Sequence, residues 1–265
     1  MNKKIILFDL DGTLLPMDQD KFINTYFSLL AKKLFNYGYE PKKLVDSVYK
    51  GTMVMISNDG SKTNEQAFWG FFKTIYGDDV IKDHNKFEEF YKNEFQLVKN
   101  VCGFNKDANE LIKYLKKENY RIILATNPIF PSIATQSRIK WAGLDIDDFE
   151  LVTTYENSKY CKPNLNYYLE ILDKINVKAE DCLMVGNDVC EDMITRKLGM
   201  DVFLVTNDLI NKSNEDIINY PNGNLSDLKL YSSIEKRGFL VETKEGIYEC
   251  LNTIRLDGQN KIQKK

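Results

Sequence analysis

Short apolar runs that end in polar residues constrain the fold of this 265-residue chain more than any other feature. They cover residues 5–8, 121–125, 182–185 and 202–205. A continuous apolar run of this length before a turn is typical of a strand that is buried on both faces. Helical patterns lie between them, over residues 106–118, 131–141, 163–175 and 191–198. Strands and helices in alternation predict an α/β fold in which a parallel sheet lies between helices.

The segment between the first two strands breaks this alternation. Its apolar residues have helical spacing in three groups: Phe22, Tyr26, Leu29, Leu30 and Leu34; Phe68, Trp69, Phe72, Ile75 and Tyr76; and Phe87, Phe90, Tyr91 and Val98. Thr63 and Gln66 precede the second group with the spacing of a capping box. Such stripes are far more often core than ligand site, so we interpret them as the core of an all-helical insertion. We expect a discontinuous core domain, residues 1–15 and 101–265, and a helical domain, residues 16–100.

The C-terminal part of the chain carries weaker signals. Residues 208–230 are rich in Asn, Asp and Ser, which predicts a long loop. Residues 238–241 form a last apolar run and predict a strand, followed by a short helix over residues 247–254.

Composition excludes several classes of function. The formal net charge is −3 and both signs are mixed along the chain, which argues against a nucleic-acid-binding surface. No apolar run reaches transmembrane length, and no segment has the pattern of a signal peptide. The five cysteines are scattered without C-x-x-C spacing, as expected in a reducing compartment. We therefore expect a cytoplasmic monomer or homodimer with no nucleic-acid or membrane partner.

Polar side chains follow each predicted strand. Asp9 and Asp11 come directly after the first, and Gly12 allows the chain to turn there; alone, these could be ordinary turn residues. Other strand or helix ends carry Thr126, Asn127, Lys162 before Pro163, Asp188 and Asp192. We expect Pro163 to begin a helix, where a cation and helix N–H groups can meet an anion. Since ligands of parallel sheets lie beyond the carboxyl ends of the strands, these residues indicate one site.

The charge of this predicted site requires a cation. Asp9, Asp11 and Asp188 would repel one another strongly at close range without one. Hard oxygen ligands from few protein positions suit Mg²⁺, which keeps several waters and binds substrate phosphate. The pattern therefore predicts magnesium and a phosphorylated substrate.

These residues, in order, resemble the four motifs of the haloacid dehalogenase (HAD) superfamily. The first is Asp9-Leu10-Asp11-Gly12-Thr13, the second Thr126, the third Lys162-Pro163, and the fourth Gly186-Asn187-Asp188 with Asp192. The resemblance covers a Rossmann-like core, about residues 1–15 and 101–205. The helical insertion resembles a type C1 cap of the phosphoglycolate phosphatase-like branch.

The resemblance implies a role for each residue. Asp9 would be the nucleophile that attacks phosphorus, and Asp11 would protonate the leaving alkoxide and then activate water. Thr126, Asn127 and Lys162 would bind the phosphoryl oxygens. Asp9, the carbonyl of Asp11 and Asp188 would bind Mg²⁺, with Asp192 behind them. The implied activity is the hydrolysis of small phosphate monoesters through an aspartyl-phosphate.

The fourth motif departs from the common family pattern. Asn187 stands where the family usually has Asp directly after Gly, and Asp188 follows it. We favour Asp188 as the ligand because Asp188 and Asp192 keep the usual separation. Glu191 is the alternative for the outer acidic position. Lys159 is a weaker candidate than Lys162 because no proline follows it.

Other functions remain open from the sequence. Asp11 favours phosphoryl transfer over dehalogenation, since a halide leaving group needs no acid. A phosphomutase and a HAD-fold regulatory or binding protein with little turnover are the alternatives to a phosphatase. The single histidine, His84, makes a Ser-His-Asp triad hard to build and is expected to be a polar surface residue. The substrate is expected to be a small phosphorylated metabolite, with candidate cap contacts at Met17, Asp20, Asn58, Asn64 and Trp69.

Overall fold

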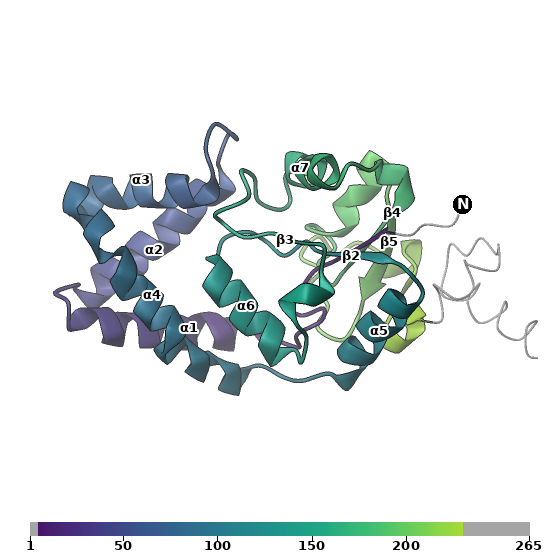
Figure 1. Ribbon diagram of the computed structural model, residues 1–265, viewed down its shortest axis with the longest axis horizontal. Helices are drawn as coiled ribbons and strands as arrows, with labels where there is room; N and C mark the ends of the chain where they lie inside the picture. Colours follow the sequence, from purple (N-terminus) through teal and green to yellow (C-terminus); the bar gives the residue numbers. More distant parts are fainter. Residues whose placement is uncertain (1–4, 230–265) are drawn as a thin grey trace, which may run out of the picture.

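A six-stranded parallel sheet forms one end of the molecule (Figure 1). The computed structural model describes residues 5–229. The strand order is β3-β2-β1-β4-β5-β6. The strands are β1 Ile5–Phe8, β2 Arg121–Leu124, β3 Leu151–Val152, β4 Cys182–Gly186, β5 Asp201–Val205 and β6 Asn222–Gly223. Phe8 is in register with Leu124 of β2 and Val185 of β4, so these central strands end at one level.

Helices cover both faces of the sheet. Successive side chains of β1 point to opposite faces, and on each face they belong to an apolar cluster that includes helical residues. Ile6 and Phe8 pack with residues of α5 Lys106–Lys117 and α6 Ser132–Trp141. Ile5 and Leu7 pack with residues of α7 Leu165–Ile175 and the 3₁₀ helix η5 Met193–Leu198. The predicted α/β fold with a parallel, Rossmann-like core is confirmed.

Several local predictions were wrong or incomplete. The two-residue edge strands β3 and β6 were missed, since neither has an apolar run of its own. Helix α7 begins at Leu165, not at Pro163, because the side chain of Asn164 caps it. The helix predicted over residues 191–198 is shorter than expected, since only Met193–Leu198 is helical, as the 3₁₀ helix η5. Residues 208–230 were predicted as a loop, yet β6 and the 3₁₀ helix η6 Ile217–Asn219 lie there. The strand and helix predicted over residues 238–241 and 247–254 lie outside the described residues.

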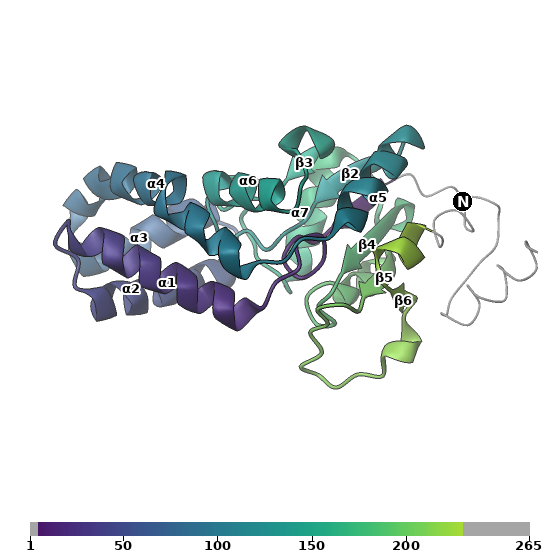
Figure 2. The same cartoon turned by 90° about the horizontal axis from the view of Figure 1, so that it is seen from below.

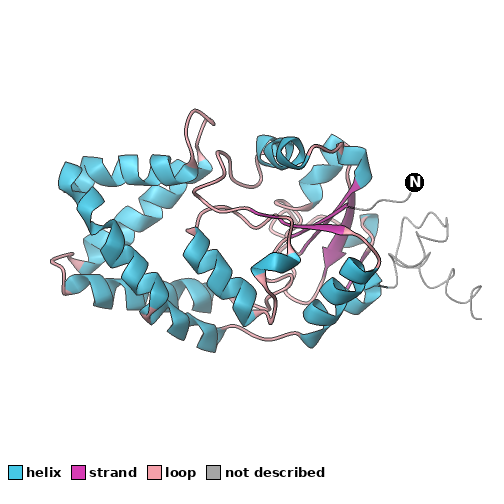
Figure 3. Ribbon diagram, in the orientation of Figure 1, coloured by secondary structure: helices cyan, strands magenta, loops and turns pink. Residues whose placement is uncertain are grey.

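The segment between β1 and α5 is helical and gathers at the other end of the molecule (Figures 1 to 3). It comprises α1 Gln19–Phe35, α2 Pro41–Ile56, α3 Asn64–Tyr76, η1 Asp78–Asp83, α4 His84–Lys92 and η2 Glu94–Val101. The capping box that Thr63 and Gln66 predict is present at the start of α3. Most residues of the three stripes are buried, as a helical core requires, whereas Leu29, Ile75 and Tyr76 are partly exposed.

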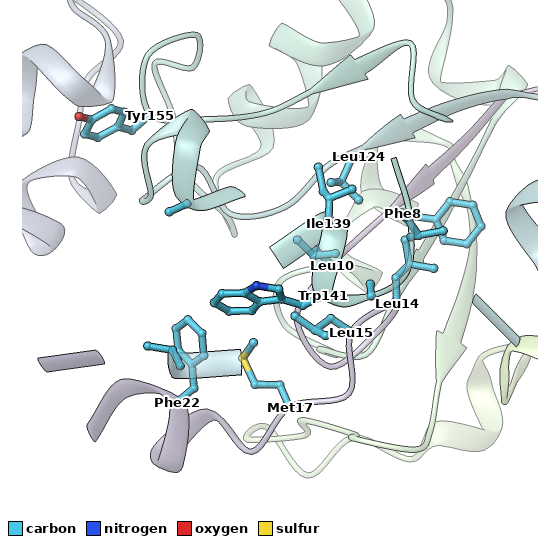
Figure 4. Packing of buried hydrophobic residues seen from close by; sticks show 14 of the residues in the cluster. Phe8, Leu10, Leu14, Leu15, Met17, Phe22, Leu124, Ile139, Trp141 and Tyr155 are labelled. Carbon is cyan, nitrogen blue, oxygen red and sulfur yellow. The ribbon is translucent and has the colours of Figure 1, made fainter. Parts of the chain in front are cut away.

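The chain enters and leaves this helical segment at neighbouring points. Met17 pairs with Cys102 in an antiparallel bridge, and the Gly103 N–H donates to the Pro16 carbonyl at 2.8 Å. Leu15 and Met17 belong to the same buried cluster as Trp141 of α6 (Figure 4). The two connections are therefore packed side by side on the sheet domain.

A third connection forms at the start of α3. The fully buried Asn64 side chain donates from Nδ2 to the carbonyl of Pro128 at 3.1 Å and accepts at Oδ1 from Asn58 at 2.9 Å. The Asn64 N–H donates to the carbonyl of Ser158 at 2.8 Å. The helical segment is thus fastened to the loop that follows β2 and to the loop between β3 and α7.

Replacing Asn64 by Ala should lower the free energy of unfolding by about 2–3 kcal/mol, because buried groups on both sides lose their partner. Urea unfolding measures the change. Asn166→Ala is the matched control, since Asn166 is exposed at the start of α7 and should change stability by less than about 0.5 kcal/mol. Equal effects of the two substitutions would contradict this role of Asn64.

Candidate active site

A cavity of about 690 Å³ lies between the carboxyl ends of the strands and the helical segment. Most of the predicted site residues line it: Asp9, Asp11, Thr126, Asn127, Asp188, Glu191 and Asp192. The structure thus brings together residues that are up to 183 positions apart in the sequence, from Asp9 to Asp192. The sheet topology accounts for this, since β1 lies between β2 and β4.

Asp9 follows β1 and is almost fully buried, with 7% of its surface exposed. Its N–H donates to the Val185 carbonyl at 2.9 Å, which extends the pairing with β4. One carboxylate oxygen, Oδ1, accepts from Lys162 Nζ at 2.8 Å, and Oδ2 accepts from Thr13 Oγ1 at 3.0 Å. The carboxylate therefore has a fixed orientation at the cavity.

Lys162 is a buried cation, 1% exposed, that lies between two carboxylates. Its Nζ donates to Asp9 at 2.8 Å and to Asp192 at 2.6 Å. Burial alone would lower the pKa of Lys162, but Asp192 and Asp9 raise it well above its usual value. Burial pushes the pKa of Asp192 upward, and Lys162 opposes that shift. With two carboxylates in contact, Lys162 stays protonated, and Asp192 is the carboxylate nearest to it, at 2.6 Å.

The local setting of Lys162 differs from the prediction. We expected Pro163 to start a helix whose N–H groups would accompany the cation, but α7 begins two residues later. The charge of Lys162 is instead balanced by Asp192. Lys159 is exposed, and its N–H donates to Glu170 at 3.0 Å.

Asp11 is paired with an arginine that sequence reasoning missed. Arg138 on α6 is 1% exposed, forms an ion pair with Asp11 and lies 4.6 Å from the ring centre of Phe130. The other oxygen of Asp11, Oδ1, is buried without a hydrogen-bond partner among residues 5–229. Burial raises the pKa of Asp11, Arg138 opposes the shift, and the charge of Asp9 adds to it. The available signal was a basic residue on the apolar face of a predicted helix.

Asn187 takes the place of the usual motif aspartate and joins two parts of the site. It is 2% exposed; its Oδ1 accepts from Thr13 at 3.1 Å, and its Nδ2 donates to the Asp208 carbonyl at 2.6 Å. A Cβ on Gly12 would lie 2.2 Å from Asn187 Nδ2, and Gly12 has φ +85°. Glycine is therefore required where the first motif turns past the fourth.

Asp188 and Asp192 have different environments. Asp188 is partly exposed, and its Oδ1 accepts from the N–H groups of Cys190 at 2.8 Å and Glu191 at 2.9 Å. Asp192 is 1% exposed, and its Oδ2 accepts from the Asp188 N–H at 3.1 Å. A Cβ on Gly186 would lie 2.0 Å from this oxygen. Only glycine at that position allows Asp192 to reach Lys162.

Thr126 and Asn127 follow β2 at the same edge. Thr126 is 2% exposed, and its carbonyl accepts from the hydroxyls of Thr153 at 2.7 Å and Tyr167 at 2.9 Å. Asn127 Nδ2 donates to Glu191 Oε2 at 3.3 Å. Burial raises the pKa of Glu191 while Lys162 lowers it. Of the two outer acids, Asp192 therefore pairs with the lysine and Glu191 with the amide.

Asp208 is a second residue that sequence reasoning missed. Its carbonyl holds Asn187, and its Oδ2 accepts the Met17 N–H at 3.1 Å. It thereby ties the fourth motif to the start of the helical segment. It lies in a predicted loop that no motif covers, so its chemistry could not be inferred from spacing.

The candidate cap contacts divide into two groups. Met17 and Trp69 line the cavity, whereas Asp20, Asn58 and Asn64 do not. His84 was expected on the surface; its side chain is 39% exposed, but it also lines the cavity, 3.7 Å from Glu65 and 3.6 Å from Glu88.

The oxygen atoms of the site fit a hard cation. Asp11 Oδ1 and Asn127 Oδ1 are buried oxygens without a partner among residues 5–229, and Asp188 is partly exposed at the cavity. No three acidic, His or Cys side chains within the described part of the chain converge on one point. The predicted ligand set does not need such a group, since it combines two carboxylates, Asp9 and Asp188, with the carbonyl of Asp11. These donors match the preference of Mg²⁺ for few protein oxygens.

No helix among the described residues is both long and apolar enough to cross a bilayer.

Comparison with known proteins identifies related sequences and a related fold. The chain is 26% identical over 220 residues to the glyceraldehyde 3-phosphate phosphatase of Methanothermobacter thermautotrophicus, covering 78% of this chain and 87% of that protein. It is 23% identical over 189 residues to the pyrophosphatase PpaX of Bacillus mycoides, covering 71% and 76%. A crystal structure of a HAD phosphatase from Thermococcus onnurineus has the same fold, with a TM-score of 0.51 and 18% identity, covering 85% of this chain and 96% of that one.

The sequence model of the haloacid dehalogenase-like hydrolases matches residues 3–195, which include all four motifs. The predicted family resemblance and the prediction of a hydrolytic enzyme of the phosphatase type are confirmed. The chain therefore belongs to the haloacid dehalogenase-like hydrolase family.

Proposed function

We propose that this protein hydrolyses small phosphate monoesters with Mg²⁺ and that phosphate is carried transiently on Asp9. The observation that carries the proposal is the buried Asp9 carboxylate, held by Lys162 at 2.8 Å and Thr13 at 3.0 Å at the cavity. The names of the two relatives, both phosphatases, support the same reaction type.

The proposed reaction has two displacements. Asp9 attacks phosphorus, so that one difficult substitution becomes two easier ones. Lys162 and the polar groups of Thr126 and Asn127 bind the phosphoryl oxygens, and the lysine offsets their negative charge. Asp11 gives a proton to the leaving alkoxide and then accepts one from the attacking water. The alternatives, a phosphomutase or a binding protein with little turnover, have no specific contact in their favour.

Asp9, Asp188 and the Asp11 carbonyl would hold Mg²⁺, which supplies positive charge that stabilises the transferring phosphoryl group. Asp192 is placed outside that set because it is almost fully buried and forms the ion pair with Lys162.

We propose that residues 16–100 act as a cap over a core of residues 1–15 and 101–265. The adjacent connections at Pro16 and Gly103 support this division. Asn64 adds a third attachment, so cap movement would have to break its hydrogen bonds to the loop that follows β2. Such a cap would exclude water during transfer to Asp9.

Asp9→Asn should abolish hydrolysis of an aryl phosphate, because the amide is not a nucleophile, and excess EDTA should abolish it in the unchanged protein. Release of inorganic phosphate measures both effects. Asp79→Asn, an exposed substitution outside the cavity, is the control and should retain full activity. Turnover that survives in Asp9→Asn or in EDTA would rule out the proposed reaction.

Asp11→Asn should slow alkyl phosphates by about 10²- to 10⁴-fold and aryl phosphates much less, because a good leaving group needs no proton. Burial raises the pKa of Asp11, so the acid form persists to higher pH than in a free carboxyl group. For alkyl esters kcat/KM should therefore fall as pH rises through that pKa, and Asp11→Asn should lose this limb of the profile. Equal losses on both ester types would assign Asp11 another role.

Lys162→Met should reduce kcat/KM by at least about 10²-fold and also destabilise the fold by about 3–5 kcal/mol, since it leaves Asp192 buried without a counter-ion. Lys159→Met is the matched control, because Lys159 is exposed and should change neither quantity appreciably. Steady-state kinetics and urea unfolding give the two readouts. A larger loss of activity in Lys159→Met would reverse the assignment of the phosphate-binding lysine.

A further inference from the structure

The cavity extends from the motif residues into an aromatic wall that the proposed reaction does not use. This aromatic wall consists of Phe22 and Tyr26 of α1, Phe68 and Trp69 of α3, Phe87 and Tyr91 of α4, and Phe130 after β2. Several of its rings meet edge to face, with centroids 5.3 Å apart for Trp69 and Phe87 and 5.5 Å apart for Tyr26 and Phe130, whereas Tyr26 and Tyr91 are stacked. The wall reaches the motifs directly, since Phe130 follows Asn127 by three residues.

The charges around the aromatic wall do not suit a second negative group. No Lys or Arg of the described helices α1 to α4 lines the cavity, whereas His84 and Glu88 do. The remaining lining cations are Arg138, which is paired with Asp11, and Lys212, which is exposed on the loop after β5. A leaving group with its own carboxylate or phosphate would meet Glu88, beside which these helices place His84 but no Lys or Arg.

The size and polarity of the cavity suit a ring. Its volume of about 690 Å³ falls within the range of small-molecule sites and far exceeds what a two- or three-carbon alcohol would fill. Trp69 lines the cavity and is 6% exposed. An apolar ring against this wall would lose its contact with water and stack on side chains that prefer such pairs.

We propose that the preferred substrate is a phosphate monoester whose alcohol carries an aromatic ring and no second negative charge. The inference rests on the proposed function, because the phosphate must lie at Asp9 for the alcohol to reach the wall. The ester P–O bond breaks as the Asp9 oxygen bonds to phosphorus, and the alcohol leaves with a proton from Asp11. Water then cleaves the bond between Asp9 and phosphorus and releases inorganic phosphate.

The test compares 3-phenylpropyl phosphate with propyl phosphate, whose leaving alcohols have nearly the same acidity, so that a difference in kcat/KM reports the ring. We expect the phenyl ester to be preferred by at least roughly tenfold, as burial of one ring implies. Thr52→Phe, which adds a ring to the cavity lining from α2, should move this ratio towards one. Thr74→Phe is the matched control, since Thr74 is an exposed helical threonine outside the cavity, and should leave the ratio unchanged.

Binding of the corresponding phosphonates, measured by calorimetry, separates this inference from the reaction. We expect the phenyl compound to bind at least roughly tenfold more tightly, and Thr52→Phe to reduce this difference; that result supports the aromatic site. If neither ester is turned over while this binding difference is found, the proposed function is contradicted and the aromatic site is not. Equal kcat/KM and equal affinity of the phenyl and propyl compounds would overturn the inference while leaving the proposed function standing. A preference for the phosphate ester of 4-hydroxybutanoate, which carries a carboxylate, would also overturn it.

Discussion

The buried ammonium group of Lys162 is the interaction on which the rest of the site depends. A charge with 1% exposure is costly unless it is fully paired, and Asp192 and Asp9 supply that pairing. The pairing dictates its surroundings: Gly186 must lack a side chain so that Asp192 can approach, and the Tyr168 hydroxyl lies 3.5 Å from the same carboxylate. When both carboxylates are ionised, they outweigh the charge of Lys162, and the net negative charge opposes the entry of a substrate phosphate unless a further cation is present. The structure therefore gives a physical reason for the proposed magnesium.

The second carboxylate of the first motif depends on a different cation. Arg138 of α6 forms an ion pair with Asp11, and the ring of Phe130 lies against its guanidinium group. These contacts fix the position of the Asp11 carboxylate apart from Lys162. In this arrangement Asp9 and Asp11 each have a basic partner of their own. Burial raises the pKa of Asp11 and Arg138 opposes that shift, so the raised pKa comes from burial and not from the basic partner.

Much of this could be predicted from sequence, because the strongest signals are local. The four central strands are continuous apolar runs, and the motif residues follow their ends, so topology alone brings Asp9 and Asp188 to one edge. Arg138 and Asp208 could not be predicted, since their roles depend on contacts between distant segments. Arg138 contacts Asp11, more than 100 residues away, and Asp208 contacts Met17, 191 residues away. The short strands β3 and β6 were not predicted because they are defined by their hydrogen bonds to the neighbouring strands β2 and β5 and not by an apolar run of their own. The aromatic stripes were correctly assigned to a core, but spacing could not show that the same rings also line a cavity.

The central claim is that phosphate bonds to Asp9, and the most direct measurement is mass spectrometry of peptides from a rapidly acid-quenched single turnover. The account predicts one phosphorylated peptide, with the added mass on Asp9, that disappears in Asp9→Asn. It should accumulate in Asp11→Asn with an aryl phosphate, whose leaving group needs no acid, because hydrolysis of the intermediate then lacks its base. Phosphate release with no labelled peptide at any time, in the unchanged protein and in Asp11→Asn alike, would contradict it. So would a label on any residue other than Asp9.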